Sequence, residues 1–199
     1  MDINEMTRNY LGDRQYESLE GKLIVASPHL DDPCFSKSLI YICAHDEDGA
    51  VGIIINHKIG MVSSKDLFFG MKYDSYLPKN KKIPLMFGGP VNTDMLIILS
   101  KKQEDDNYLI SKDFSVYTDI FSFLKDKKDP LEKFILAKGV TAWDSYQLDE
   151  EVEANDWLIV EPSSDLVFSQ KRGDTIWNSV IKSIGIGKHH GLVHYSGSA

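Results

Sequence analysis

The sequence has little cysteine and no long apolar run. Its two cysteines, Cys34 and Cys43, form no CxxC pair, so they predict neither a zinc site nor a disulfide framework. No apolar stretch approaches the ~20 residues that a membrane-spanning helix needs. The N-terminal sequence MDINEMTRNY lacks the apolar core of a signal peptide. We therefore expect a cytoplasmic protein without a membrane-spanning segment.

Basic residues are fewer than acidic ones. The chain carries 22 Lys and Arg against 30 Asp and Glu, a formal net charge of -8, and such a surface repels the phosphate backbone of nucleic acids. Two short lysine runs, 79–82 and 125–128, interrupt this pattern, and we interpret both as solvated turns. Because no helix-turn-helix pattern is visible either, we expect no direct nucleic-acid binding.

Three apolar runs near the N-terminus organise the chain. They are Leu23 to Ala26, Ser38 to Ala44 and Val51 to Ile55, and their β-branched and aromatic content is typical of strands. An Asp48-Gly49 pair separates the last two. Glycine adopts the positive φ that tight turns need, so this pair predicts an antiparallel hairpin.

Further strands and helices alternate irregularly along the rest of the chain. We predict strands at 83–87, 95–99, 108–110, 134–140 and 157–160, and helices beginning near Ser64 and spanning 115–127, 145–154 and 174–184. Strands outnumber helices, which indicates an α+β fold. We expect a single domain over residues 19–199, preceded by a polar lead-in of residues 1–18. It would be built on one large mixed, mostly antiparallel sheet with helices packed against it.

Four segments resemble the YqgE/AlgH family of bacterial proteins. The first is SPHLDDPCFSKSLIYICAHDEDGAVGIIIN, which begins at Ser27, and the others are 87–91, 139–150 and 157–160, in the family's order. The resemblance implies the same α+β fold. No reaction is securely attached to the family, whose name implies a regulator. The family usually has a small-residue turn where this chain has Ser145-Tyr146.

Two clusters of polar side chains could carry chemistry. Ser27-Pro28-His29 suggests a nucleophile and a base, but no G-x-S-x-G elbow is present, and on an extended segment Ser27 and His29 would point apart. Possible metal ligands occur at 29–32 and 45–48. A strand separates the two groups by ~20 Å, so they should not share an ion. We expect no metal and no cofactor.

Other residues predict a binding groove at the loops that end the strands. Gly88 and Gly89 follow a strand, where bare backbone could approach a ligand. Asp144 or Ser145 could cap the next helix, which would leave Trp143 at its mouth and Gln147 one turn in. The complete set of groove candidates is Ser27, Asp32, His45, Asn56, Gly88, Gly89, Trp143 and Gln147.

Three functions remain open on this sequence. We favour a non-enzymatic regulatory or binding protein whose groove receives an unidentified protein partner or small ligand. One alternative is a hydrolase or metal-dependent enzyme that uses Ser27, His45 and Asp46. The other is a transcriptional regulator that acts directly on DNA, which the net charge of -8 disfavours.

Overall fold

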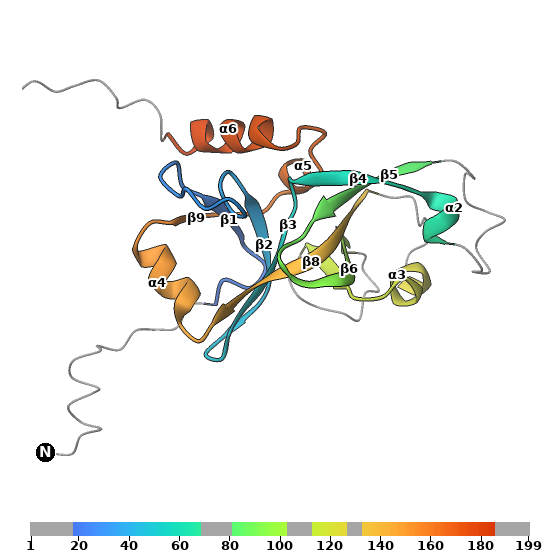
Figure 1. Ribbon diagram of the computed structural model, residues 1–199, viewed down its shortest axis with the longest axis horizontal. Coiled ribbons are helices and arrows are strands. Elements are labelled where there is room, and N and C mark those ends of the chain that lie inside the picture. The colour runs from blue at the N-terminus through green and yellow to red at the C-terminus, as the bar shows by residue number, and fades with distance from the viewer. Residues whose placement is uncertain (1–17, 69–80, 103–112, 127–132, 186–199) are drawn as a thin grey trace, which may run out of the picture.

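A computed structural model describes residues 18–68, 81–102, 113–126 and 133–185 (Figure 1). Within these ranges, nine strands form one mixed sheet and five helices accompany them. The α+β prediction is therefore confirmed. The lead-in up to residue 17 and the predicted strand at 108–110 lie outside the described residues. No helix in the described ranges is long and apolar enough to cross a membrane.

The bounds of the first three strands follow the three N-terminal apolar runs closely. The strands are β1 (Leu23–Ala26), β2 (Leu39–Asp46), β3 (Gly49–Ile54), β4 (Lys58–Ser63), β5 (Lys82–Phe87), β6 (Val91–Lys101), β7 (Phe114–Tyr117), β8 (Phe134–Asp144) and β9 (Trp157–Val160). The helices are α2 (Ser64–Leu67), α3 (Ile120–Asp126), α4 (Gln147–Glu153), α5 (Ser164–Val167) and α6 (Asp174–Ser183).

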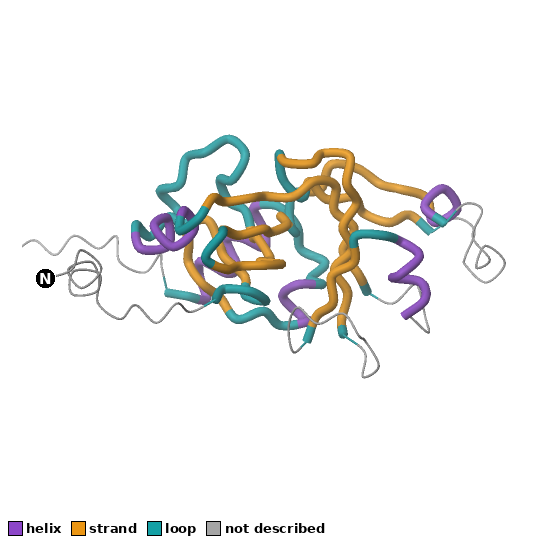
Figure 2. The backbone as a smooth tube through the Cα atoms, turned by 90° about the horizontal axis from the view of Figure 1, so that it is seen from below, coloured by secondary structure: helices purple, strands orange, loops and turns teal. Residues whose placement is uncertain are grey.

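Strand β8 belongs to both halves of the sheet. Its first part lies beside β5 and β6, and its last part pairs with β3. From β3 the sheet continues antiparallel through β2 and β1 to β9. Among the described strands, β5 and β8 form the one parallel pair. Figure 2 shows the strands in the middle of the molecule with the helices around them.

Both faces of the β1–β2–β3 half are buried, which explains its nearly continuous apolar runs. Leu23 and Val25 face the core under α5 and α6, whereas Ile24 and Ala26 face the core under α4. Figure 1 shows α6 and α4 on opposite sides of these strands. Trp177 of α6 is buried, and its indole N–H donates a hydrogen bond to the carbonyl oxygen of Ala26 (2.7 Å). A third apolar cluster joins α3 to β5, β6 and β8.

The predicted helix at 115–127 is wrong in its first turn. Ser115 and Val116 belong to β7, where they pair with Ser100 and Leu99 of β6. The helix begins at Ile120, after Asp119 accepts a hydrogen bond from the backbone N–H of Ser122 (2.8 Å). The spacing of apolar residues suited a helix, but pairing with β6 prevailed over it. Strand β4 was also missed, because its residues are half-buried or exposed and show no apolar alternation.

Three glycines allow two backbones to meet where β8 passes from one half of the sheet to the other. A Cβ on Gly88 would lie 2.1 Å from the carbonyl oxygen of Gly139, and Gly139 itself has a φ of +79°. The N–H of Gly88 donates to Lys138 O (2.8 Å), and its carbonyl accepts from Ile54 N (2.9 Å). Gly89, with a φ of +151°, lies against Val140. We call Gly88, Gly89 and Gly139 the glycine junction.

Replacing Gly88 tests the packing at the junction alone. Its φ is not positive, so alanine can adopt the same backbone conformation. We expect Gly88→Ala to lower the free energy of unfolding by ~3 kcal/mol or more, since the added methyl meets fixed backbone. Gly60→Ala is the matched control, because a Cβ there meets no atom within 4 Å. Urea unfolding measures both variants. Equal midpoints for Gly88→Ala and Gly60→Ala would contradict the packing role.

Candidate functional site

The structure places the eight groove candidates at three locations. His45, Trp143 and Gln147 meet where the β2–β3 hairpin, the end of β8 and the start of α4 come together. Gly88 and Gly89 are in the glycine junction. Ser27, Asp32 and Asn56 lie near the other end of β2, after β1 and β3. The candidates therefore do not share one surface.

A single carboxylate connects the residues at the α4 end. Oε2 of Glu151 accepts hydrogen bonds from the indole N–H groups of Trp143 (2.8 Å) and Trp157 (2.7 Å). Its Oε1 accepts from the side-chain amide of Gln147 (2.8 Å). The two indole rings pack edge to face, with centroids 6.0 Å apart. Since Glu151 satisfies donors from β8, β9 and α4, it holds these three elements in one rigid arrangement.

The predicted cap of α4 is wrong in detail. Neither Asp144 nor Ser145 caps the helix: its N-cap residue is Tyr146, which makes no side-chain capping bond. Gln147 instead reaches back and accepts the backbone N–H of Asp144 (3.0 Å). Ser145 donates its hydroxyl to the carbonyl of Glu47 (2.6 Å). This bond ties the turn to the tip of the β2–β3 hairpin.

His45 is buried at this end and supports the fold from within. Its Nδ1 accepts the backbone N–H of Leu19 (3.0 Å), which places a ring proton on Nε2, 3.4 Å from Oδ2 of Asp149. Asp46 accepts the N–H of Asp48 (3.0 Å) and so supports the hairpin turn. In the part of the chain that the structure describes, no three His, Cys, Asp or Glu side chains are grouped to hold a metal ion.

Tyr146 stands out at the α4 end because its backbone is left-handed. Its φ is +59°, a conformation that costs a residue with a Cβ ~1–2 kcal/mol, and its side chain is 53% exposed. A cost of this size in an exposed aromatic is a signal for function, because strain concentrates at functional sites.

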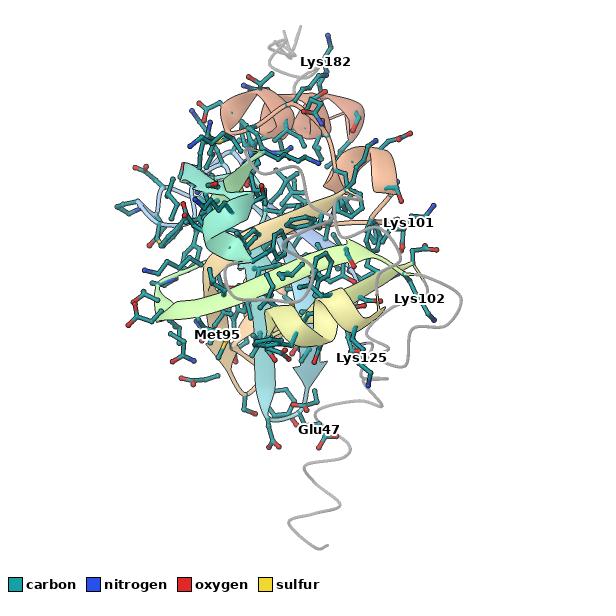
Figure 3. All side chains as sticks on the ribbon, turned by 90° about the vertical axis from the view of Figure 1, so that its right-hand side faces the viewer. Glu47, Met95, Lys101, Lys102, Lys125 and Lys182 are labelled. Carbon is teal, nitrogen blue, oxygen red and sulfur yellow. The ribbon has the colours of Figure 1, made fainter. Side chains whose placement is uncertain are left out.

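Exposed acidic residues flank Tyr146 in the sequence, and others lie at the hairpin tip that Ser145 contacts. We call this region, with Tyr146, the acidic end: Asp46, Glu47, Asp48, Asp144 and Glu150. Figure 3 shows Glu47 at one extremity of the molecule and Lys182 at the other.

Ser27, His29 and Asp156 form a chain of contacts that the sequence argument missed. Ser27 Oγ lies 3.1 Å from Nδ1 of His29, and Nε2 of the same ring lies 3.1 Å from Oδ1 of Asp156. The prediction that Ser27 and His29 point apart is wrong because the segment is a turn, closed by the N–H of Leu30 on the carbonyl of Ser27 (3.1 Å).

The accessibility of Ser27 argues against nucleophilic catalysis there. Ser27 is 3% exposed, and its backbone N–H donates to the carbonyl of Asp156 (2.9 Å), so it is not available to an oxyanion. His45 lies at the opposite end of β2, ~20 Å away by the rise of a strand. Ser27 and His45 therefore cannot act as one catalytic pair.

Asp32 and Asn56 are engaged in internal hydrogen bonds. Asp32 accepts the N–H groups of Cys34 (2.7 Å) and Phe35 (3.0 Å). Asn56 is buried, accepts the N–H of Leu39 (2.8 Å) and donates to the carbonyls of Lys37 (3.0 Å) and Gly173 (3.3 Å). Asp32 therefore stabilises its own turn, and Asn56 connects β2 and β3 to the start of α6.

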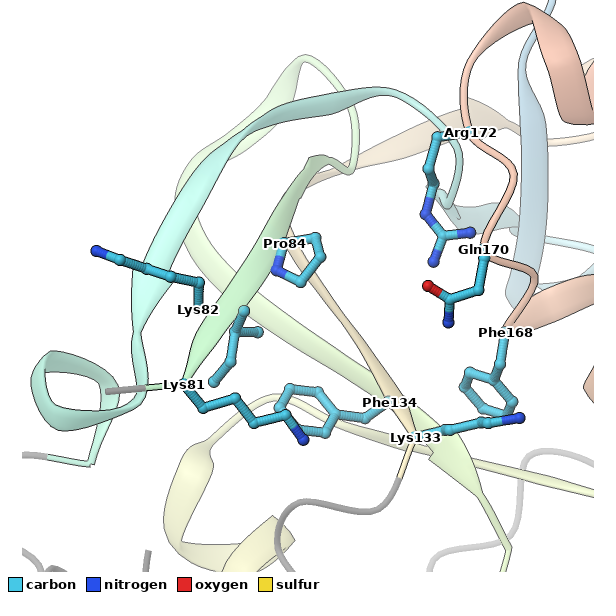
Figure 4. Close-up of a pocket in the computed structure, with 9 residues that line it drawn as sticks. Lys81, Lys82, Pro84, Lys133, Phe134, Phe168, Gln170 and Arg172 are labelled. Carbon is cyan, nitrogen blue, oxygen red and sulfur yellow. The ribbon is translucent and has the colours of Figure 1, made fainter. Parts of the chain in front are cut away.

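A cavity of about 300 Å³ lies at the other end of β8 (Figure 4). Three segments distant in the sequence line it: Lys81, Lys82, Ile83 and Pro84 at β5; Lys133 and Phe134 at β8; and Phe168, Gln170 and Arg172 between α5 and α6. Sequence reasoning missed this site, since it treated the lysine run at 79–82 as a solvated turn.

Comparison with known proteins gives a consistent assignment. A family model described as AlgH-like matches residues 23–189. A UPF0301 protein from Aliivibrio salmonicida is 34% identical over 178 residues, covering 84% of this chain and 92% of that protein. One from Rickettsia conorii is 32% identical over 189 residues, covering 90% and 96%.

Two solved structures share the fold. The solution structure of the AlgH protein from Pseudomonas aeruginosa superimposes with a TM-score of 0.65 at 24% identity, covering 94% of this chain and 100% of that one. A crystal structure of a protein from Corynebacterium diphtheriae gives a TM-score of 0.62 at 18% identity, covering 87% and 91%.

The burial of Ser27 predicts its response to a serine-directed reagent. A fluorophosphonate probe should leave Ser27 unmodified in the folded protein, because the residue is buried and its backbone N–H is already bonded to Asp156. Intact-mass analysis with peptide mapping measures the modification, and a known serine hydrolase serves as the positive control. Stoichiometric labelling at Ser27, abolished by His29→Ala, would instead establish a reactive serine.

Proposed function

The chain belongs to the AlgH-like family, and we propose that it is a non-enzymatic regulatory or binding protein that recognises a protein partner through the acidic end. The observation that carries this proposal is Tyr146. An exposed aromatic ring is held there at a backbone conformation that glycine would adopt without cost. Tyrosine is enriched among residues that dominate binding energy at protein interfaces.

The surroundings of Tyr146 suit recognition because they are rigid. Glu151 joins Trp143, Trp157 and Gln147, and the Ser145 hydroxyl fixes the turn against the hairpin. A ring presented from such a platform loses little conformational freedom when it is buried by a partner. The loops at the α4 end therefore offer a preorganised surface to a partner.

The charge of the acidic end indicates the chemistry of the partner. Five exposed acidic residues lie at the hairpin tip and in the α4 region, which the Ser145–Glu47 hydrogen bond holds together next to Tyr146. A partner with a basic surface and a recess for one aromatic ring would complement this patch, and charge complementarity favours both encounter and register. The same carboxylates disfavour a transcriptional regulator that grips DNA directly through this surface.

The state of the cysteines supports action in the cytoplasm. Cys34 and Cys43 are both free, and free cysteines persist in reducing compartments. Burial raises the pKa of the Cys43 thiol to about 12, so this thiol stays protonated and behaves as a small apolar side chain.

A hydrolase is the second candidate function. The contact series from Ser27 through His29 to Asp156 favours it, because a serine, a base and an orienting carboxylate are the groups that acyl transfer needs. The burial of Ser27 and the use of its N–H within the fold rank this function below partner binding.

The substitution Tyr146→Gly separates binding from folding. Glycine relieves the left-handed backbone, so the free energy of unfolding should stay the same or rise by ~1 kcal/mol. The aromatic anchor is lost, so the partner should no longer be captured. Cross-linked capture of the full chain from its own cells, followed by mass spectrometry, measures this loss. Phe121→Ala, which removes another exposed ring (69% exposed), is the control and should retain the partner.

Two outcomes bear directly on this proposal. If the Tyr146→Gly variant fails to capture a protein that wild type captures, Tyr146 is the aromatic anchor. If wild type also fails to capture that protein at about 0.5 M salt, the interface is charged, because salt screens exposed charges. Retention of every captured protein by a stable Tyr146→Gly variant would overturn the assignment of this surface.

A further inference from the structure

The cavity at the start of β8 concentrates positive charge in an acidic protein. The nine described residues that line it include three lysines and one arginine and no carboxylate, although the chain as a whole has a net charge of -8. The parallel register of β5 and β8, which pairs Leu85 with Leu136, brings the lysines together. The segment between α5 and α6 adds the arginine from the opposite wall.

Arg172 is positioned within this wall by the backbone. Its guanidinium donates hydrogen bonds to the carbonyl oxygens of Ser169 and Lys171, and Figure 4 shows it reaching into the cavity beside Gln170. Burial lowers the pKa of Arg172, and no carboxylate among the described residues pairs with it. A partly buried cation that has no carboxylate partner among the described residues favours an anion beside it.

The lysines complete a site that is open on one side. Lys81 extends beneath Phe134, whereas Lys82 points away from the cavity (Figure 4). Lys133 is exposed at the start of β8. Lys81, Lys133 and Arg172 thus supply cations from three segments, an arrangement that suits an anion with several acceptor oxygens, such as phosphate, better than a single carboxylate.

The remaining lining gives the site an apolar half. Ile83, Pro84, Phe134 and Phe168 contribute apolar surface, and the Gln170 amide offers both a donor and an acceptor. The volume of about 300 Å³ is at the small end of the ~300–1,000 Å³ range of small-molecule pockets. The occupant should therefore combine a phosphate with one flat, apolar group that can form hydrogen bonds at its edge.

We propose that this cavity binds a small phosphorylated molecule of the nucleoside monophosphate class. Arg172, Lys81 and Lys133 would contact the phosphate, while Phe134 and Gln170 would contact the flat group. The cavity and the acidic end lie at opposite ends of β8, so this proposal stands independently of the protein-partner proposal. It adds a small-molecule site to the fold.

Calorimetric titration of the full chain tests the proposal. The probes are the four ribonucleoside 5′-monophosphates, a nucleoside without phosphate and inorganic phosphate, each at low and high salt. We expect at least one monophosphate to bind, more tightly than either the nucleoside or inorganic phosphate, and more weakly as salt rises. Arg172→Gln should weaken that binding about tenfold or more, the effect of one charge-assisted hydrogen bond.

Lys133→Gln and Lys182→Gln are the matched pair of lysine variants. Lys133 lines the cavity and makes no ion pair with another described residue, so its loss should leave folding intact and weaken binding about threefold. Lys182→Gln removes the same charge from α6, which does not line the cavity, and should leave binding unchanged.

Three results would overturn the assignment. The first is the absence of binding by all four monophosphates at millimolar concentration. The second is equal affinity in wild type, Arg172→Gln and Lys133→Gln. The third is tighter binding of a duplex oligonucleotide that is lost in the same variants, which would assign the site to nucleic acid.

Discussion

The fold depends on a contact between bare backbones at the glycine junction. Gly88 and Gly89 leave the end of β5 and lie directly against Gly139 and Val140 of β8, at distances that exclude a Cβ. Near this point β8 changes neighbours: it pairs with β5 up to Lys138 and with β6 up to Val140, and it pairs with β3 from Thr141 onward. Without the close approach, the two halves of the sheet could not share one strand.

That shared strand also separates the two proposed binding surfaces. Phe134, at the start of β8, lines the cavity, and Trp143, near the end of β8, is hydrogen-bonded to the Glu151 carboxylate of α4. The separation explains how an acidic protein can offer an anion site and a basic-partner site together. Each surface is set by local residues, because the Debye length of ~8 Å at physiological salt is shorter than the strand between them.

Sequence reasoning succeeded where the signal was local. The β2–β3 hairpin, β1 and α6 follow from a turn pair, an apolar run and a helical period. It failed where position depends on distant pairing: β7 was assigned to a helix, and the Ser27 turn was assumed extended. The glycines were recognised as special, but their packing partner, Gly139, is remote in sequence. The cavity could not be predicted, because it is formed by the pairing of β5 with β8 and by Arg172, which are far apart in the sequence.

Native-state hydrogen exchange tests the central claim that β8 joins both halves into one cooperative unit. Amides of β2 and of β6, which lie in different halves, should exchange through global unfolding, with equal free energies and equal dependence on denaturant. Two separate plateaus, with the β6 amides opening well below the β2 amides, would show that the halves unfold independently. The glycine junction would then be a local contact and not the element that unites the fold.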